Sequence, residues 1–174
     1  TDEGAPMLPL FAYGAVGFAN GRFYVCAKKV DEDVRQVFKG ISRGKIDRSA
    51  RKIIEDFPDN RLMQHIMQNC TLRYGCPAAK NLSLGRYEAP LPTSRTCNAR
   101  CIGCISQQEE GPNICATPQC RLTFTPTPAA VVAIMRFHAG SETETPVLSF
   151  GQGCEGDPLT EAPPHIESEQ RYRE

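Results

Sequence analysis

Three cysteines lie within eight residues of the chain, at Cys97, Cys101 and Cys104, in a C-x3-C-x2-C spacing. Thiolates are soft ligands that select zinc, copper(I) or iron–sulfur clusters. Three of them on one short loop can bind one side of a metal centre without ligands from distant parts of the chain. A structural zinc site and a [4Fe–4S] cluster both normally take four protein ligands, so three cysteines alone leave one position open.

Six further cysteines bring the total to nine among 174 residues. Cys115 and Cys120 follow the loop, and either could supply the fourth ligand of a zinc site. Together with Cys154 they could instead hold an auxiliary cluster. Cys70 and Cys76 are close in sequence, and Cys76 precedes a proline, as cysteines do at some iron–sulfur sites. The simpler interpretation of that pair is two buried, unligated thiols.

Charge and hydropathy exclude several classes of function. Lys+Arg and Asp+Glu balance at 20 each, so no global field favours nucleic acid or an anionic membrane. No segment approaches the roughly 20 apolar residues that a membrane helix needs. The N-terminal residues show no signal-peptide pattern. We therefore expect a reducing, cytoplasmic compartment, where clustered cysteines more often bind metal than form disulfides.

The elements around the cysteine loop predict a β–α–β unit. The run before the loop indicates a strand end. Thr127-Pro128 is a good helix start, because a hydroxyl caps the helix and proline costs nothing at its first position. One face of this helix, which ends near Gly140, carries Val131, Ile134, Met135 and His138. Residues 146–150 predict a buried strand, followed by a glycine-rich turn over 151–158. Sites in parallel sheets lie beyond the carboxyl ends of the strands, so we expect the loop and the turn to lie side by side.

A β-hairpin is predicted over residues 8–30. The segments Leu8–Phe18 and Arg22–Val30 are rich in aromatic and β-branched residues and flank Asn20-Gly21. Asn-Gly suits the positive φ angles of a type I′ turn. Cys26, in the second predicted strand, is expected to be a small buried hydrophobe.

Two helices are expected after the hairpin. The first covers about 47–57, with Asp47 as its cap, and its buried side holds Ile53, Ile54 and Phe57. The second covers about 60–70, and its apolar positions are Leu62, Met63, Ile66 and Met67. His65 lies among polar neighbours on this helix, so we expect it at the surface or at an interface.

The expected domain boundary lies near residue 90. Residues 81–96 contain one glycine and two prolines, which interrupt regular structure. We assign residues 1–90 to a small α+β module with the hairpin and two helices, and residues 91–174 to an α/β unit. The last stretch, residues 159–174, carries two prolines and many charges and predicts no clear element.

The cysteine loop resembles the signature of the radical S-adenosylmethionine (radical SAM) enzymes, whose C-x3-C-x2-C motif often begins Cys-Asn, as at Cys97-Asn98. In that family a Gly-Gly-Glu-Pro turn follows the second strand, and here Glu155-Gly156-Asp157-Pro158 follows the apolar strand. The longer phrase Ser149–Gly156 also looks like an uncharacterised bacterial branch of the family. The resemblance covers about residues 93–160.

The resemblance implies a fold, two cofactors and a reaction. The fold is the start of a partial (β/α)6 barrel. Cys97, Cys101 and Cys104 would hold three irons of a [4Fe–4S] cluster, and the fourth iron would bind the amino and carboxylate groups of S-adenosylmethionine. Reductive cleavage of the sulfonium gives a 5′-deoxyadenosyl radical that acts on a substrate. The motifs identify neither this substrate nor the catalytic residues. A flavodoxin- or ferredoxin-like protein is the expected electron donor.

The resemblance also implies five cofactor-binding residues, which are Gly103, Gly153, Glu155, Gly156 and Asp157. Two of them depart from the family pattern. Gly103 replaces an aromatic residue that packs beside the adenine. Asp157 replaces a glutamate, which shortens the carboxylate by one methylene.

Only the first β–α–β part of such a barrel is present in residues 91–174, so we expect this chain alone to be incomplete and inactive. A second hypothesis is a structural zinc module, in which the loop cysteines and Cys115 or Cys120 close a tetrahedral site. A third is a fragment that binds no metal. The Gly156–Pro158 turn favours the first hypothesis, because a zinc module has no need of it.

Overall fold

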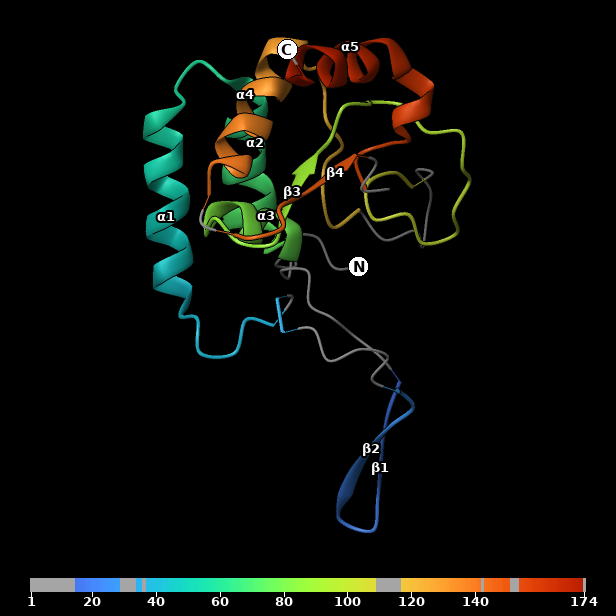
Figure 1. The fold of residues 1–174 in the computed structure, drawn as a ribbon. Helices are drawn as coiled ribbons and strands as arrows, with labels where there is room; N and C mark the ends of the chain where they lie inside the picture. The colour runs from blue at the N-terminus through green and yellow to red at the C-terminus, as the bar shows by residue number, and fades with distance from the viewer. Residues whose placement is uncertain are drawn as a thin grey trace.

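The computed structural model describes residues 15–28, 34–35, 37–108, 117–141, 143–150 and 154–173. Figure 1 shows a mixed α/β body from which a two-stranded hairpin extends. The strands are β1 (Val16–Ala19), β2 (Arg22–Val25), β3 (Glu88–Leu91) and β4 (Val147–Phe150). The helices are α1 (Arg43–Asp56), α2 (Arg61–His65), the π-helix η1 (Ile66–Arg73), α3 (Pro77–Ser83), α4 (Pro128–Ala139), the 3-10 helix η2 (Pro158–Glu161) and α5 (Ala162–Arg173). The described strands form two two-stranded sheets and no closed barrel.

The hairpin confirms the predicted turn and corrects the predicted strands. β1 and β2 pair antiparallel, with Ala19 opposite Arg22. Asn20 and Gly21 have φ angles of 51° and 73°, the positive values that a type I′ turn requires. Each strand has four residues, fewer than predicted, and all of them are exposed. Residues 8–14 of the predicted first strand lie outside the described part of the chain.

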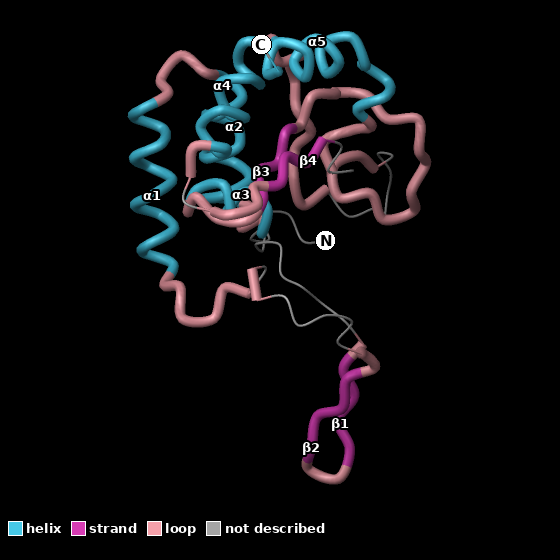
Figure 2. The backbone as a smooth tube through the Cα atoms, viewed as in Figure 1, coloured by secondary structure: helices cyan, strands magenta, loops and turns pink. Residues whose placement is uncertain are grey.

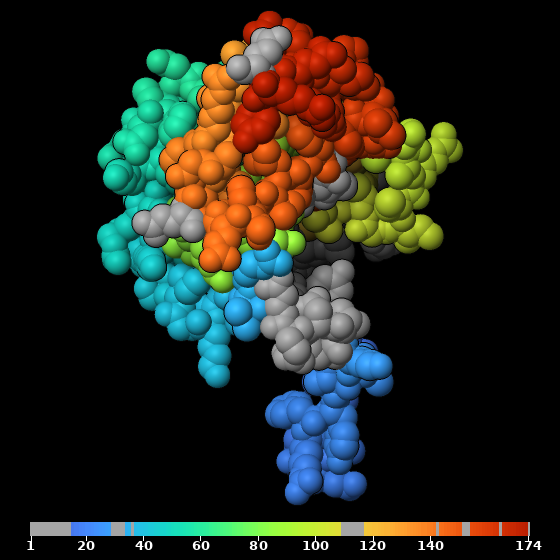
Figure 3. Space-filling view, in the orientation of Figure 1, coloured from blue at the N-terminus to red at the C-terminus, as the bar shows by residue number. Residues whose placement is uncertain are grey.

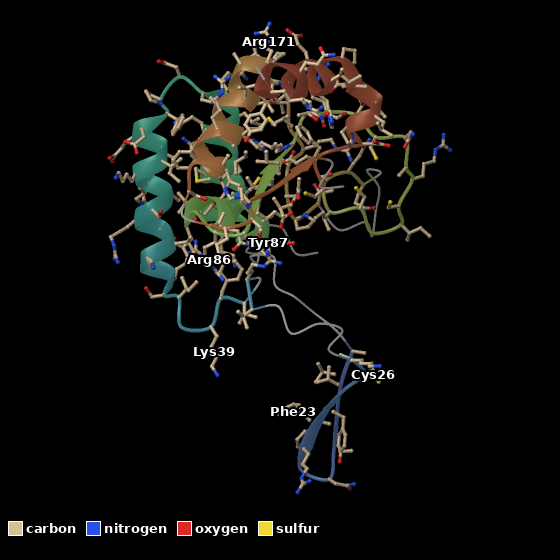
Figure 4. The ribbon with its side chains drawn as sticks, viewed as in Figure 1. Phe23, Cys26, Lys39, Arg86, Tyr87 and Arg171 are labelled. Atoms are coloured by element: carbon tan, nitrogen blue, oxygen red, sulfur yellow. The ribbon has the colours of Figure 1, made fainter. Side chains whose placement is uncertain are left out.

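Cys26 lies just beyond β2 and is exposed, so the expectation of a buried thiol is wrong. Figures 2 and 4 show the reason, since the hairpin that carries Phe23 and Cys26 stands away from the helices. Phe18 and Phe23 pack on one another, with ring centroids 5.0 Å apart. In the part of the chain that the structure describes, no layer packs beneath this hairpin, so the hairpin offers no interior in which a thiol could be buried.

The first helix begins four residues earlier than the sequence pattern predicts. Ser42 is the N-cap of α1, and its side chain accepts a hydrogen bond from the backbone N–H of Lys45. Asp47 is not the cap, because it lies inside the helix and forms a salt bridge with Arg43 at 2.7 Å. The predicted buried side is confirmed at Ile53, against which Ile54 and Phe57 are partly buried.

The second predicted helix consists of two consecutive elements, α2 and the π-helix η1. Asn60 caps α2 by accepting from the backbone N–H of Met63. After His65 the backbone widens into the π-helix η1, which continues to Arg73. π-helices are rare, occur mostly as single turns and are frequent at functional sites, so an eight-residue example is unusual. Simple apolar periodicity does not distinguish it from an α-helix.

The predicted β–α–β unit is present as β3, α4 and β4, but β4 is partly buried and not the buried strand that the pattern predicts. β3 and β4 pair parallel, with Leu91 opposite Phe150. Thr127 caps α4 by accepting from the N–H of Ala130, and Pro128 takes the first helical position, as predicted. The expectation of interrupted structure over residues 81–96 is wrong at β3, which contains Pro90. Proline is tolerated there because β3 is an edge strand, where one N–H can remain unpaired.

α5 is a second element that the sequence pattern misses. The expectation of no clear element over residues 159–174 is wrong, because η2 and α5 together cover Pro158–Arg173. Pro163-Pro164 falls in the first turn of α5, where the N–H groups have no intrahelical partner and prolines cost little. The helix packs against α4 (Figure 1), and Glu167 and Arg171 form an i,i+4 ion pair on its surface.

One hydrophobic core joins residues from both sides of position 90. Its fully buried side chains include the four apolar positions predicted for the second helix, together with Leu91, Val131 and Ile134. The predicted α4 face is confirmed through His138, which is fully buried. Each fully buried aliphatic side chain of this size stabilises the fold by about 1.5–3 kcal/mol. The strands that lead to the cysteine loop and the turn are therefore anchored in the same core as α2.

Ile134→Val is expected to lower the free energy of unfolding by about 0.5–1.5 kcal/mol, because it removes one methylene from a closely packed interior. Ile134 is 0 % exposed. Denaturant unfolding measures the change. Ile102→Val is the matched control, because Ile102 is 100 % exposed and its substitution should leave the unfolding midpoint unchanged. Equal effects at the two positions would contradict the described core.

Candidate functional site

The cysteine loop and the turn after β4 lie side by side, as predicted. The backbone N–H of Asp157 donates to the carbonyl of Thr96, at 2.8 Å. The Thr160 hydroxyl donates to the same carbonyl, at 2.9 Å, and lies 2.9 Å from the hydroxyl of Ser94. In Figure 3 the yellow-green atoms of the cysteine loop lie at the surface beside the orange-red C-terminal residues. The start of the loop is therefore bonded to the start of η2.

Gly156 brings the two segments into direct backbone contact. Its φ angle is +129°, which L side chains rarely adopt. A Cβ at this position would lie 2.6 Å from the carbonyl oxygen of Thr96 and 2.8 Å from that of Ser94. Both neighbours are backbone atoms, which cannot rotate away as a flexible side chain can. Only glycine fits here, and the packing of the turn on the loop depends on it.

A partly exposed ion pair also joins the start of the cysteine loop to η2. Glu161, the last residue of η2, accepts from the backbone N–H of Arg95 at 2.7 Å and pairs with its guanidinium at 3.0 Å. Partial burial raises the pKa of Glu161, but the hydrogen bonds from the Arg95 backbone and guanidinium outweigh it, and the net shift is downward. The carboxylate therefore stays ionised, and stays paired, to a lower pH than an ordinary glutamate.

Glu161→Gln is expected to lower the free energy of unfolding at pH 7 by less than about 1 kcal/mol, since the Arg95 side chain is half exposed and solvent screens the pair. Because the folded pKa is depressed, this stabilisation is present above the unfolded pKa of about 4.3 and is lost as the pH falls through the folded value. Urea unfolding of both proteins between pH 3 and pH 7 should show the difference shrinking toward low pH. A difference that grows toward low pH would contradict the assigned pairing.

The three loop thiols differ in their surroundings. Cys101 is exposed, and Cys97 and Cys104 are partly exposed. The Ser106 backbone N–H and hydroxyl, with the nearby Arg121 guanidinium, lower the pKa of the Cys104 thiol despite an opposing effect of partial burial. The sulfur lies 3.7 Å from both the Ser106 hydroxyl and the Arg121 guanidinium. These neighbours favour the thiolate, which is the form that binds metal.

The structure does not gather the three loop sulfurs around one point. Within the described ranges, the group of metal-competent side chains whose ligand atoms all lie within 4.8 Å of one another is His65, Cys70 and Glu155, and not the three loop cysteines. Ligands of one zinc ion must meet at one point, whereas the thiolates of an iron–sulfur cluster bind separate irons. The iron–sulfur cluster at this loop stays a prediction from the sequence pattern.

The predicted cofactor-binding residues lie in different surroundings. Gly103 is exposed on the cysteine loop, and Gly156 and Asp157 lie against Thr96. The Asp157 carboxylate caps η2 by accepting from the N–H of Leu159 at 2.9 Å. Gly153 lies outside the described residues, as does Cys115.

Glu155 is turned into the core. Its side chain is 3 % exposed. One oxygen lies 2.7 Å from Nε2 of His65 and 3.6 Å from Sγ of Cys70. The other oxygen accepts from the backbone N–H of Leu122, at 2.6 Å. Both oxygens of this carboxylate are thus engaged by residues of the chain itself.

His65 is the site residue that sequence reasoning misplaces. Its expected position at the surface is wrong, because its side chain is only 11 % exposed and is paired with Glu155. The polar neighbours in sequence suggest an exposed face, but the partner lies 90 positions away. A carboxylate that follows an apolar strand, and a histidine beside the apolar positions of a helix, are each visible in the sequence. Their pairing is a product of the tertiary fold.

The remaining cysteines are mostly thiols in or near the core. Cys70 is buried, as expected, and burial together with Glu155 raises its pKa well above the ordinary value. Burial also raises the pKa of Cys76 and brings that of Cys154 to about 11. Cys120 is exposed, and its backbone N–H donates to the Tyr74 hydroxyl at 3.1 Å.

Comparison with known proteins adds no family assignment. No family model, no curated protein and no solved structure matches the chain. In the described residues, no helix combines the length and the apolar character needed to cross a bilayer. The functional argument therefore depends on the motifs and on the geometry given above.

Proposed function

We propose that this chain carries the cluster-binding part of a radical SAM enzyme, with Cys97, Cys101 and Cys104 as ligands of a [4Fe–4S] cluster. The supporting observation is the close packing of Gly156 and Asp157 against the start of the cysteine loop, at the carboxyl ends of two parallel strands. Ligands of α/β proteins bind at these ends. The order strand, cysteine loop, helix, strand and glycine turn is the order that the resemblance implies.

When bound, the cluster and S-adenosylmethionine together supply one-electron cleavage of the sulfonium and a 5′-deoxyadenosyl radical for an unidentified substrate. The chain contributes binding and orientation. Cys97, Cys101 and Cys104 provide three thiolates, and the surroundings of Cys104 favour its charged form. Gly156, which has no side chain, lets the turn approach the loop, and backbone groups of the turn would help to hold S-adenosylmethionine there.

The β3–β4 pair would form the first part of a partial (β/α)6 barrel. β4 has one paired edge in the described residues, so further β–α units, from the same protein or another chain, would extend the sheet there. The proposal includes a cytoplasmic location and a flavodoxin- or ferredoxin-like electron donor. It includes neither a nucleic acid nor a membrane partner.

Anaerobic reconstitution with iron and sulfide tests the proposal. We expect a brown protein whose visible absorption and paramagnetic spectra are those of a [4Fe–4S] cluster, and whose reduced spectrum changes when S-adenosylmethionine is added. A colourless protein with one zinc ion held by the loop cysteines would replace this proposal with the zinc-module hypothesis. A cluster whose spectrum ignores S-adenosylmethionine would exclude the radical SAM reaction for this chain.

A further inference from the structure

A second group of metal-competent side chains lies in the core, apart from the cysteine loop. It consists of His65 at the end of α2, Cys70 in η1 and Glu155 after β4, and their ligand atoms all lie within 4.8 Å of one another. Glu155 and Cys70 are 2 % and 8 % exposed. Buried charged groups are costly unless they are paired or coordinate a metal. The function proposed above makes no use of this cluster.

The π-helix is what brings His65 and Cys70 together. The two residues are five positions apart. In an α-helix, with 3.6 residues per turn, such residues point about 140° apart around the axis. A π-helix closes its hydrogen bonds between residues five apart, so one wide turn places Cys70 near His65 on the same side. The rare backbone of η1 thus gathers two ligand types that a regular helix would separate.

Further groups hold two of the three ligands in place. The second oxygen of Glu155 accepts from the backbone N–H of Leu122, which leaves the first oxygen to face His65 and Cys70. The side-chain amide of Asn69 lies 3.2 Å from Nδ1 of His65. The atom nearer to Nδ1 is the amide nitrogen, which donates to it, so Nε2 is the ring nitrogen that donates to Glu155 in this arrangement. A metal at Nε2 would replace that hydrogen bond, and a 180° turn of the Asn69 amide would let its oxygen accept from Nδ1–H. Metal-binding histidines and carboxylates usually have such supporting partners.

We propose that His65, Cys70 and Glu155 form a buried site for a divalent ion of borderline softness such as Zn²⁺. The ligand atoms are Nε2 of His65, Sγ of Cys70 and Oε1 of Glu155. Nitrogen, thiolate and carboxylate ligands are the set that zinc binds. Bonds of about 2.0–2.3 Å in tetrahedral geometry separate two ligands by about 3.3–3.8 Å. The 3.6 Å between Oε1 of Glu155 and Sγ of Cys70 lies within this range. The 2.7 Å between Oε1 and Nε2 of His65 is a hydrogen-bond distance, so these two atoms would move apart when an ion enters between them.

Binding exchanges protons for the ion. The Cys70 thiol proton and the proton shared by His65 and Glu155 leave to solvent, and the ion takes their place between the same atoms. Three protein ligands leave the fourth position of a tetrahedral site to a water molecule. The site would bind α2, η1 and the turn after β4 to one another from inside the fold.

A cobalt titration isolates this site from the loop. Co²⁺ replaces Zn²⁺ in such sites and reports thiolate ligation by a charge-transfer absorption band. The protein used is the Cys97→Ser, Cys101→Ser, Cys104→Ser triple variant, which has no thiolates on the loop. We expect one Co²⁺ per chain, a charge-transfer band, and displacement of Co²⁺ by an equal amount of Zn²⁺, which binds such ligands more tightly than Co²⁺ does.

Added substitutions identify the ligands. Cys70→Ser should abolish the charge-transfer band, and Asn69→Ala should weaken binding by about 10- to 100-fold. Cys120→Ser is the matched control, because this exposed thiol lies outside the cluster, and it should change nothing. Circular dichroism checks that each variant is folded, and His65→Gln replaces Cys70→Ser in the test if the latter unfolds. No bound Co²⁺ in the triple variant, or a band that survives in folded Cys70→Ser, would overturn the proposal.

The outcome is separable from that of the proposed function. Cys70→Ser in an otherwise unchanged chain should keep the cluster spectrum, because Cys70 is not a loop ligand. The loop triple variant should keep the cobalt site. Failure of one test therefore leaves the other standing.

Discussion

Replacing Cys101 with serine is expected to lower the iron and sulfide content of the reconstituted protein by at least about tenfold. Substituting a residue that only supports a metal ligand already lowers metal affinity by about 10- to 100-fold. The reason is that two thiolates hold a cluster far less well than three. Cys97→Ser and Cys104→Ser should behave alike. Iron analysis, visible absorption and paramagnetic spectra after anaerobic reconstitution measure the loss, and the S-adenosylmethionine response should vanish with it.

Matched cysteines outside the loop control for a general loss of thiols. Cys26 and Cys120 are exposed, as Cys101 is, so all three are equally open to reagents. Cys26→Ser and Cys120→Ser should leave the cluster content unchanged. If Cys120→Ser removes as much iron as Cys101→Ser, Cys120 is a ligand, and the three-cysteine assignment is wrong. Ligand identity is thus decided by comparison among residues of similar exposure.

Local chemistry explains which parts of the fold the sequence pattern predicts. The Asn20-Gly21 turn, the Thr127 cap with Pro128 after it, and the β4 strand all depend on residues close together in the chain. A hydroxyl cap, a proline at the first helical position and a positive φ angle each act within about one turn of backbone. These elements are present where they are predicted, with bounds that differ by a few residues.

The elements that are missed depend on distant partners or on context. Pro90 argues against a strand, but β3 is an edge strand that pairs with β4, so the missing N–H is harmless. Pro163-Pro164 argues against a helix, but both residues fall in the first turn of α5. In each case a residue that usually breaks structure lies at the one position that tolerates it. The sequence alone does not reveal that position.

The candidate site shows the same division. The adjacency of the cysteine loop and the glycine turn follows from a β–α–β pattern, because parallel strands place their carboxyl ends together. The pairing of His65 with Glu155 does not follow from any local pattern. It requires the π-helix to widen after His65 and the chain to return after β4. Glu155 resembles a cofactor residue in sequence, yet its carboxylate is occupied in the core.

Gly156→Ala is expected to lower the free energy of unfolding by about 2–4 kcal/mol, combining the cost of an unfavourable φ angle with that of overpacking. The added Cβ would lie 2.6 Å and 2.8 Å from two backbone oxygens, at a φ angle of +129°. Because the turn must move away to relieve this contact, the Asp157–Thr96 hydrogen bond should break as well. Urea unfolding measures the stability, and reconstitution with S-adenosylmethionine measures whether the turn still serves the cluster.

Gly44→Ala is the control for this substitution, and its expected effect has the opposite sign. Gly44 lies in the first turn of α1, and its φ angle lies outside the left-handed region that favours glycine. The nearest atom to an added Cβ is in the flexible Arg48 side chain, at 3.5 Å. Alanine should stabilise an exposed helical position of this kind by up to about 1 kcal/mol. A Gly156→Ala protein as stable as the Gly44→Ala protein would show that the turn does not pack on the loop as described. A destabilised Gly156→Ala protein whose cluster still responds fully to S-adenosylmethionine would separate the structural role of this glycine from cofactor binding.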